Sequence, residues 1–255
     1  MGISVTGLSV TPVKSTRLQT VDSIVLGREG VRDNRRFYLV DHRKHLINGK
    51  RLGELNAIVA QYSEPRLSLT FPDGTTVDDE VRLGDEIETK FFSATDCGQL
   101  VEGPWSEALT DYAGQPLTLV KARSSAIDRG ALGVASLISR ASLNRLAQEG
   151  GDDEIDCRRF RMLIEIDGVD AHAEDRWVGR STRVGDATVR WMGHVGRCLT
   201  TSRDPDTGTI DLPTLDLLRS YRGNLDSTEP LPFGIHGAVL DEGAVRVGDE
   251  VVPLD

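Results

Sequence analysis

The sequence has little cysteine, and it contains no long hydrophobic run. Only three of its 255 residues are cysteine, and none of them lies in a CxxC pair. An odd number of cysteines without that spacing favours neither a disulfide framework nor a zinc site. No stretch of about 18 apolar residues is present, so no membrane-spanning helix is expected. The start, MGISVTGLSVTPVKS, lacks the layout of a signal peptide. These absences together predict a cytoplasmic protein.

Negative charge dominates the composition. Lys and Arg number 30 against 40 Asp and Glu, which gives a formal net charge of -10 and a pI near 5.0. Nucleic-acid binding would call for a basic face, so no nucleic-acid partner is expected, and local groups of basic residues become informative. The sequence also lacks a GxGxxG motif and a Walker loop, which leaves nicotinamide and nucleoside triphosphate sites without support.

Short runs of alternating apolar residues make up most of the chain, as in ISVTGLSVTPV and RRFYLVD. This period of two predicts strands. Three similar phrases each predict a strand that meets a turn or bulge at a Gly-Asp pair: VRLGDEIE at 81–88, TRVGDATV at 182–189 and VRVGDEVV at 245–252. Three short helices that end at a glycine are also expected, over residues 104–114, 139–150 and 212–223.

These elements predict a mainly β (α+β) protein in two parts. We expect a β-barrel-like N-terminal domain over residues 1–114 and a β-rich second domain with a few short helices over residues 115–255. No Gly/Ser/Pro-rich tether separates the two parts, so they should pack together. Their junction should then hold a cleft.

Basic residues gather in four short segments at the edges of expected strands. The arginine fork makes paired hydrogen bonds to phosphate, so side chains from all four segments would suit one anionic ligand in a cleft. Solvated pairing with some of the 40 acidic residues is the alternative interpretation. The segments contain Lys14 and Arg17; Arg32, Arg35 and Arg36; Arg158, Arg159 and Arg161; and Arg197 and Arg203.

Cys198 is the first candidate for chemistry. It lies in HVGRCLTTSRDPDTG at residues 194–208, directly after Arg197. The thiolate is the form of cysteine that attacks electrophiles and binds metals, and neighbouring cations favour it. A small buried thiol is the alternative interpretation. The DPDTG segment predicts a turn, which would leave Cys198 on a strand end or loop within reach of a ligand.

Several of these segments occur together in a recognisable order: TPVKS, DNRRFYLVD, RRFR, EDRWVG, GRCLTTSRDPDTG, LLRSYRG, PFG and GAVRVGDEV. This order resembles that of proteins with a MOSC domain, the molybdenum cofactor sulfurase C-terminal domain, preceded by an N-terminal β-barrel companion. The resemblance covers nearly the whole chain. Among proteins of this kind, the chain is similar to the family of the mitochondrial amidoxime reducing component.

The resemblance implies a β-rich protein that binds molybdenum cofactor, a pterin dithiolene with a phosphate tail. Carried over by motif, Cys198 corresponds to the catalytic cysteine and metal ligand. Contacts to the pterin and phosphate are implied for five further residues: Lys14, Ser15, Arg35, Arg161 and Arg197. This set suits the ligand, because an anionic phosphate requires cationic donors and a soft thiolate suits molybdenum.

Three segments depart from the family pattern: FRML, DRGALGVAS and NGKRLGEL. Met162 and Leu163 replace a proline and an asparagine, and the loop at 128–136 is mostly small and apolar. These changes predict fewer polar contacts to the cofactor. Cys97 has no assigned role, and Cys157 is expected to be a packed structural thiol.

Three functions follow from the resemblance. The first is an oxidoreductase that reduces N-hydroxylated or related small molecules, with electrons from a separate reductase or ferredoxin-like partner, because the chain has no flavin or iron–sulfur motif. The second is a sulfur carrier with a persulfide on Cys198, supplied by a separate pyridoxal phosphate-dependent cysteine desulfurase. The third is a binding protein for molybdenum cofactor without catalytic activity.

Overall fold

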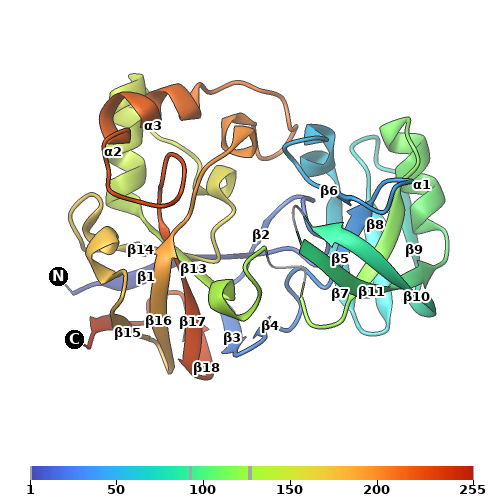
Figure 1. The fold of residues 1–255 in the computed structure, drawn as a ribbon, viewed down its shortest axis with the longest axis horizontal. Helices are drawn as coiled ribbons and strands as arrows, with labels where there is room; N and C mark the ends of the chain where they lie inside the picture. The colour runs from blue at the N-terminus through green and yellow to red at the C-terminus, as the bar shows by residue number, and fades with distance from the viewer. Residues whose placement is uncertain (1, 92–93, 126–127, 255) are drawn as a thin grey trace.

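Strands dominate the computed structural model, which describes residues 2–91, 94–125 and 128–254. The prediction of a mainly β protein is confirmed. Figure 1 shows two strand-rich units along the long axis, with both chain termini at the outer end of one unit. Backbone pairing joins the termini, because the amide of Val251 donates to the carbonyl of Ile3 over 2.9 Å.

The larger sheet has eight strands and forms the unit at the left of Figure 1. All its neighbours pair antiparallel except the parallel pair β13 and β14. In spatial order the strands are β19 (Val251–Pro253), β15 (Ser181–Val184), β16 (Ala187–His194), β17 (Ile235–Asp241), β13 (Ala135–Ser139), β14 (Ile164–Asp167), β1 (Ser4–Val10) and β2 (Gln19–Thr20).

The second unit contains a five-stranded sheet of β10 (Arg82–Phe91), β11 (Ala94–Glu102), β12 (Thr118–Ala122), β5 (Phe37–Val40) and β6 (Leu46–Ile47), in that spatial order. All four residues of β5 are buried, since alternate side chains enter different apolar clusters on the two faces. In the described residues the edges meet only at one isolated bridge, between His45 and Lys90. The expected barrel is therefore not confirmed.

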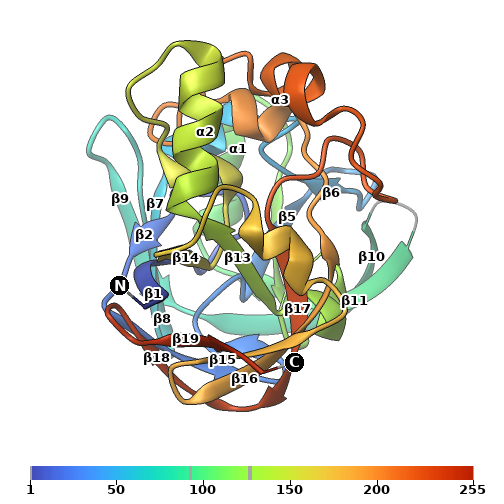
Figure 2. The ribbon, with the colours of Figure 1, turned by 90° about the vertical axis from the view of Figure 1, so that its left-hand side faces the viewer.

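Two smaller sheets and three helices complete the fold. The sheets are β18 (Gly243–Arg246) with β3 (Ser23–Gly27) and β4 (Gly30–Val31), and β7 (Val59–Ser63) with β8 (Arg66–Thr70) and β9 (Thr76–Glu80). All three expected helices are confirmed: α1 (Trp105–Ala113), α2 (Arg140–Gly150) and α3 (Thr214–Arg222). Figure 2 shows α2 and α3 together above the large sheet, where their leucines share one apolar cluster.

The Gly-Asp phrases form the expected turns and bulge. Gly185 and Gly248 have φ of 57° and 93° in tight turns after β15 and β18, a conformation that glycine adopts without strain. The first phrase lies within β10, where the pairing register shifts between Leu83 and Glu86. One local sequence pattern therefore serves both as a turn and as a bulge.

The expected division into residues 1–114 and 115–255 stays a prediction, and four strand pairs cross it. Strand β12 pairs with β5 and β11 of the N-terminal unit. In the other direction, β1 pairs with β14, and β3 pairs with β18. The first strand of the chain therefore belongs to the core of the C-terminal unit, where Val5 and Leu8 are fully buried.

Within the described residues, no helix has the length and apolar character needed to cross a membrane.

Leu8→Ala tests the role of β1 in the C-terminal core. Leu8 has no exposed surface, so its truncation should lower the free energy of unfolding by about 2 to 5 kcal/mol through lost burial and a residual cavity. Urea denaturation measures this change. The matched control is Leu83→Ala, because Leu83 is 39% exposed and should lose less than about 1 kcal/mol. Equal effects of the two substitutions would contradict the assignment of β1 to this core.

Candidate functional site

A cavity of about 270 Å³ lies where the two units meet, and all six predicted site residues line it. Lys14, Ser15 and Arg35 come from the N-terminal part of the chain, and Arg161, Arg197 and Cys198 from the C-terminal part. The predicted cleft at the junction is therefore present. Its volume is near the lower end of the range for small-molecule sites, about 300 to 1,000 Å³.

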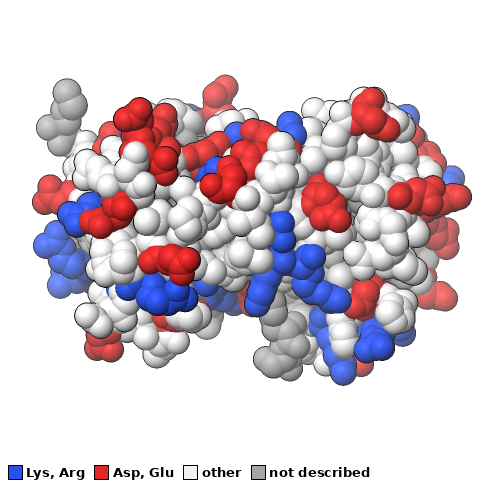
Figure 3. All heavy atoms as spheres, turned by 90° about the horizontal axis from the view of Figure 1, so that it is seen from above, with Lys and Arg blue, Asp and Glu red and all other residues white. Residues whose placement is uncertain are grey.

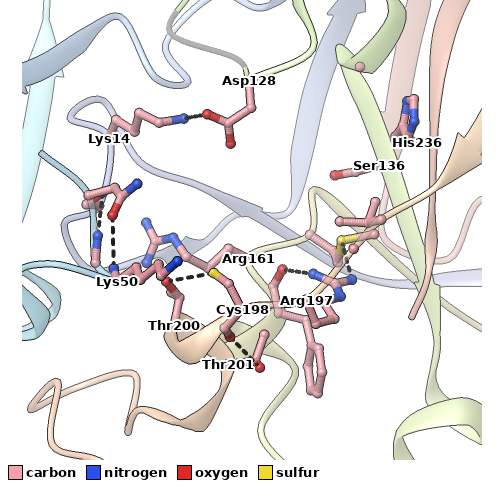
Figure 4. Close-up of a pocket in the computed structure, with 18 of the residues that line it drawn as sticks. Lys14, Lys50, Asp128, Ser136, Arg161, Arg197, Cys198, Thr200, Thr201 and His236 are labelled. Atoms are coloured by element: carbon pink, nitrogen blue, oxygen red, sulfur yellow. Dashed lines mark hydrogen bonds and ion pairs between the residues drawn. The ribbon is translucent and has the colours of Figure 1, made fainter. Parts of the chain in front are cut away.

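The Cys198 thiol is exposed and points into the middle of the cavity (Figure 4). Cys198 lies in the loop after β16, directly before the 3-10 helix η5 (Leu199–Ser202). Its Sγ is 3.5 Å from Thr200 Oγ1, and its carbonyl accepts a hydrogen bond from the Thr201 hydroxyl. The loop position agrees with the prediction, and the solvent-facing thiol does not fit the alternative of a buried apolar cysteine.

The DPDTG segment forms the predicted turn and fixes this loop against the N-terminal unit. Asp204 Oδ1 accepts hydrogen bonds from the amides of Asp206 and Thr207, while Gly208 has φ of 77°. A Cβ on Gly208 would lie 1.9 Å from the carbonyl oxygen of Gly53. Only glycine at this position allows so close an approach of the two backbones.

Left-handed backbone conformations cluster at the cavity. Ser15, Arg35 and Arg161 have φ of 78°, 52° and 54°. Such angles are uncommon for residues other than glycine, and they persist where surrounding contacts hold them, often at functional sites. The Arg35 amide donates to the Thr11 carbonyl, and the Arg161 amide donates to the Arg158 carbonyl at the end of the 3-10 helix η3 (Cys157–Phe160). The fold thus fixes the direction of three cavity side chains at some conformational cost.

Positive charge strongly exceeds negative charge around the cavity. Among the described lining residues only one carboxylate occurs, that of Asp128, whereas seven are basic: Lys14, Arg35, Lys50, Arg129, Arg159, Arg161 and Arg197. Lys14 Nζ lies 2.7 Å from Asp128 Oδ1. Burial lowers the pKa of Lys14 to about 8, although Asp128 opposes this shift. Burial likewise lowers the pKa of Arg35 and Arg161. These groups are held at an electrostatic cost that an anionic ligand would reduce.

Arg161 and Arg35 bridge the two halves of the site. Arg161 donates from Nη2 to the Thr16 carbonyl over 2.7 Å and from Nη1 to Asn56 Oδ1 over 3.3 Å. Arg35 donates from Nη2 to the Arg161 carbonyl over 3.0 Å. Each guanidinium therefore contacts the other unit, so this arrangement of Arg35 and Arg161 at the cavity forms only when the two units pack together.

Arg197 faces inward rather than across the cavity. Its Nε donates to the Phe233 carbonyl over 2.7 Å, and its Nη1 donates to the Phe160 carbonyl over 2.8 Å. Its Nη2 lies 3.2 Å from the Met162 sulfur. Burial lowers the pKa of Arg197. A direct contact of Arg197 with the cofactor stays a prediction. In the structure, its buried guanidinium holds the loop that leads to Cys198 through bonds to backbone carbonyls.

Most of the other basic residues of the four segments pair with acidic residues, as the alternative interpretation held, whereas Arg36 and Arg203 donate to backbone carbonyls. Arg158 pairs with Asp156 and Asp206, and Arg17 also pairs with Asp206. The others are likewise engaged: Arg32 with Glu64, Arg36 with the Ser124 carbonyl, Arg159 with Asp211 and Arg203 with the Gly208 carbonyl. On the surface seen in Figure 3 basic and acidic groups are interspersed. Each segment thus divides its charges between site and scaffold.

Sequence reasoning missed several cavity residues: Asn48, Gly49, Lys50, Arg129, Gly133, Ser136, Thr200, Thr201 and His236. Asn48 to Lys50 lie in the NGKRLGEL segment, where fewer polar contacts were expected. The amide of Gly49 donates to Ser15 Oγ over 3.2 Å, so this segment supports a predicted residue. The loop at 128–136 also supplies polar groups, contrary to expectation: Asp128, Arg129 and Ser136 all line the cavity. The sequence did offer one signal for these residues, because Gly49 lies between the polar residues Asn48 and Lys50.

The expected structural role of Cys157 agrees with its surroundings. Its side chain packs beside the apolar cluster under α2 and α3. Burial and the neighbouring Glu165 raise the pKa of the Cys157 thiol far above its ordinary range. A neutral thiol is a poor nucleophile, so Cys157 lacks the properties of a second reactive cysteine.

Comparison with known proteins identifies the C-terminal unit. Residues 130–252 match the family model of the MOSC domain. This segment of the chain is similar to the MOSC domain. This family is associated with molybdenum cofactor, and the MOSC region includes Arg161, Arg197 and Cys198.

Two relatives of the chain carry the same name. The chain is 40% identical to human mitochondrial amidoxime reducing component 2 in an alignment of 99 positions that covers 36% of this chain and 29% of that protein. It is 26% identical to the bovine protein of that name in an alignment of 283 positions that covers 98% of this chain and 83% of that protein. A crystal structure of the YUAD protein from Bacillus subtilis aligns with 98% of this chain and 94% of its own, at 12% identity and a TM-score of 0.46.

The pH dependence of anion binding tests the role of Lys14. Sulfate is a suitable probe because it stays a dianion across neutral and alkaline pH. Lys14 attracts an anion only when protonated, and its pKa is about 8, so sulfate affinity should fall about tenfold between pH 7 and pH 9. Isothermal titration calorimetry measures this affinity.

Lys14→Met is the control for the same experiment. The variant should bind sulfate more weakly than the wild type at pH 7 and should lose the fall in affinity near pH 8. A wild-type affinity that does not change between pH 7 and pH 9 would show that Lys14 does not contact the anion.

Proposed function

We propose that the cavity binds molybdenum cofactor, with the Cys198 thiolate as the protein ligand of the metal. The observation that carries this proposal is an exposed thiol at the centre of a cavity with seven basic side chains and one carboxylate among its described lining residues. A soft thiolate suits molybdenum, and the surrounding cations suit the phosphate and the anionic dithiolene. The residues present therefore fit the group chemically.

Separate parts of the cavity would hold separate parts of the cofactor. Lys14, Ser15, Arg35 and Arg161 lie on the cationic side and suit the phosphate and the pterin. Cys198 lies apart from Lys14 across the cavity, as Figure 4 shows. Ser136 and His236 occupy a further side. Their hydrogen-bonding groups offer contacts either to the pterin or to a substrate beside Cys198.

We also propose an oxidoreductase activity toward N-hydroxylated or related N-oxygenated small molecules. The names of the relatives, which describe amidoxime reduction, support this reaction class. When bound, the cofactor supplies two-electron redox chemistry at its metal. The protein's part is to hold that metal through Cys198 and to balance the charge around it. A separate reductase or ferredoxin-like protein is the proposed electron donor, and the cytoplasm is the proposed location.

Molybdenum content tests the binding proposal. The wild type should contain molybdenum close to one atom per chain when expressed in a host that makes the cofactor. Cys198→Ala should lose most of it, because the remaining groups attract the phosphate but do not ligate the metal. Cys97→Ala, which alters a cysteine in β11 outside the cavity lining, should retain the wild-type amount. Inductively coupled plasma mass spectrometry measures all three proteins. Equal molybdenum in both variants would contradict ligation by Cys198.

Turnover distinguishes the proposed activity from the two alternatives. The loaded protein should reduce an amidoxime with a reduced viologen as electron donor, and Cys198→Ala should show less than about 1% of that rate because it lacks the centre. Cyanide-releasable sulfur on Cys198 in protein without molybdenum would instead support a sulfur carrier. Stoichiometric molybdenum without turnover would support a binding protein.

A further inference from the structure

Asp128 is unusual among the charged residues at the cavity. It is the one carboxylate that lines the cavity within the described residues. Its Oδ1 lies 2.7 Å from Lys14 Nζ, and Figure 4 shows the two side chains extended toward each other. The exposed fractions of the two side chains differ, at 7% for Lys14 and 38% for Asp128. The ammonium is therefore fixed inside the wall, whereas the carboxylate also reaches solvent.

Other carboxylates near the site are held by more contacts. Asp211 accepts two hydrogen bonds from Arg159, over 2.6 and 2.7 Å. Asp206 accepts from both terminal nitrogens of Arg158 and also pairs with Arg17. Neither carboxylate lines the cavity. These acids lie outside the cavity, although Arg159 lines it, whereas the Asp128 carboxylate lines the cavity itself beside Lys14.

The position of Asp128 places it in competition with a ligand. An oxyanion that binds Lys14 must approach the same ammonium that Asp128 contacts, and two anions close to one cation repel each other. With 38% of its surface exposed, the Asp128 side chain is able to turn toward water, although Arg35 and Arg129 also attract its carboxylate. Displacement is therefore less costly for Asp128 than for the multiply bonded Asp206 and Asp211.

We propose that Asp128 is an internal competitor, which the phosphate-type oxyanion of the ligand displaces from Lys14. The proposal rests on the proposed function only in that the cavity accepts an anion. Asp128 would weaken binding of every anion and would favour dianions over monoanions. Arg35 and Arg161 already attract the Asp128 carboxylate, so a monoanion merely replaces it by another charge of equal size, whereas a dianion brings them a second negative charge. Asp128 would thus act as a determinant of affinity and specificity.

Sulfate binding at pH 6.5 tests this competition. Asp128→Asn should bind sulfate at least about tenfold more tightly than the wild type, because it removes a competing charge adjacent to the ammonium. Asp128→Glu should bind like the wild type, since it restores the carboxylate. Asp211→Asn is the matched control: it removes the same charge from a residue that pairs with a lining arginine but does not itself line the cavity. Its affinity should change less than about threefold.

Several outcomes would overturn the competition. They are unchanged or weaker sulfate binding by Asp128→Asn, no measurable binding by it, or equal tightening by Asp211→Asn. Unchanged binding would show that Asp128 neither competes with the anion nor orders Lys14. Weaker or unmeasurable binding would indicate that Asp128 orders Lys14 for the ligand, and equal tightening would indicate a general charge effect. Circular dichroism of each variant confirms that the fold is kept.

The molybdenum content of Asp128→Asn separates this proposal from the proposed function. Tighter sulfate binding together with molybdenum equal to or above the wild-type amount supports both, with the cofactor phosphate as the anion. Tighter sulfate binding by a protein that never contains molybdenum supports the competition with a free phosphate as ligand, and it contradicts the cofactor. Molybdenum in the wild type with unchanged sulfate binding in Asp128→Asn contradicts the competition alone.

Discussion

Lys14 and Arg197 are each less than a tenth exposed, yet both bring positive charge into the junction of the two units. Moving a charged group out of water is unfavourable unless hydrogen bonds and opposite charges replace the lost solvation. The chain meets this requirement in two ways. Arg197 is surrounded by backbone carbonyls and lies 5.2 Å from the centre of the Phe160 ring, whereas Lys14 contacts a carboxylate. The architecture around the cavity follows from supplying these partners.

Partners for these buried charges are available only because some residues adopt backbone conformations that most residues avoid. Arg161 follows η3 with a left-handed φ, so its carbonyl accepts from Arg35 while its own side chain reaches Thr16 and Asn56. Gly234 serves the same end at Arg197, because a Cβ there would lie 3.2 Å from Arg197 Nη2 and 2.9 Å from the Met162 methyl carbon. Strain at a few positions thus accompanies a cavity wall that is set before any ligand arrives, as expected of preorganised sites.

The sequence predicted which residues line the cavity better than it predicted the arrangement of the units. Cys198, Lys14 and Arg161 were identified from motif and charge, since the residue types that such chemistry needs are few. The exchange of strands was not identified, because alternation in β1 shows that one face is buried but not which sheet buries it. Asp128 was missed for a similar reason: an acidic residue in an acidic chain gives no signal, and its importance comes only from its 2.7 Å distance to Lys14.

The two cysteines near the C-terminal core show how position, more than residue type, sets chemistry here. Cys157 begins η3, and the same short helix leads through Arg159 and Phe160 to the cavity. The thiol of Cys157, however, meets Glu165 on the other side of that helix and is kept neutral. Cys198 precedes η5, which packs against η3, and its sulfur enters the cationic cavity. Two short 3-10 helices that pack together therefore carry thiols in different surroundings. Cys157 in η3 lies beside a carboxylate, whereas Cys198 before η5 lies in a cavity lined by arginines. Only the Cys198 thiol is exposed in the cavity, where a metal or an electrophile would reach it.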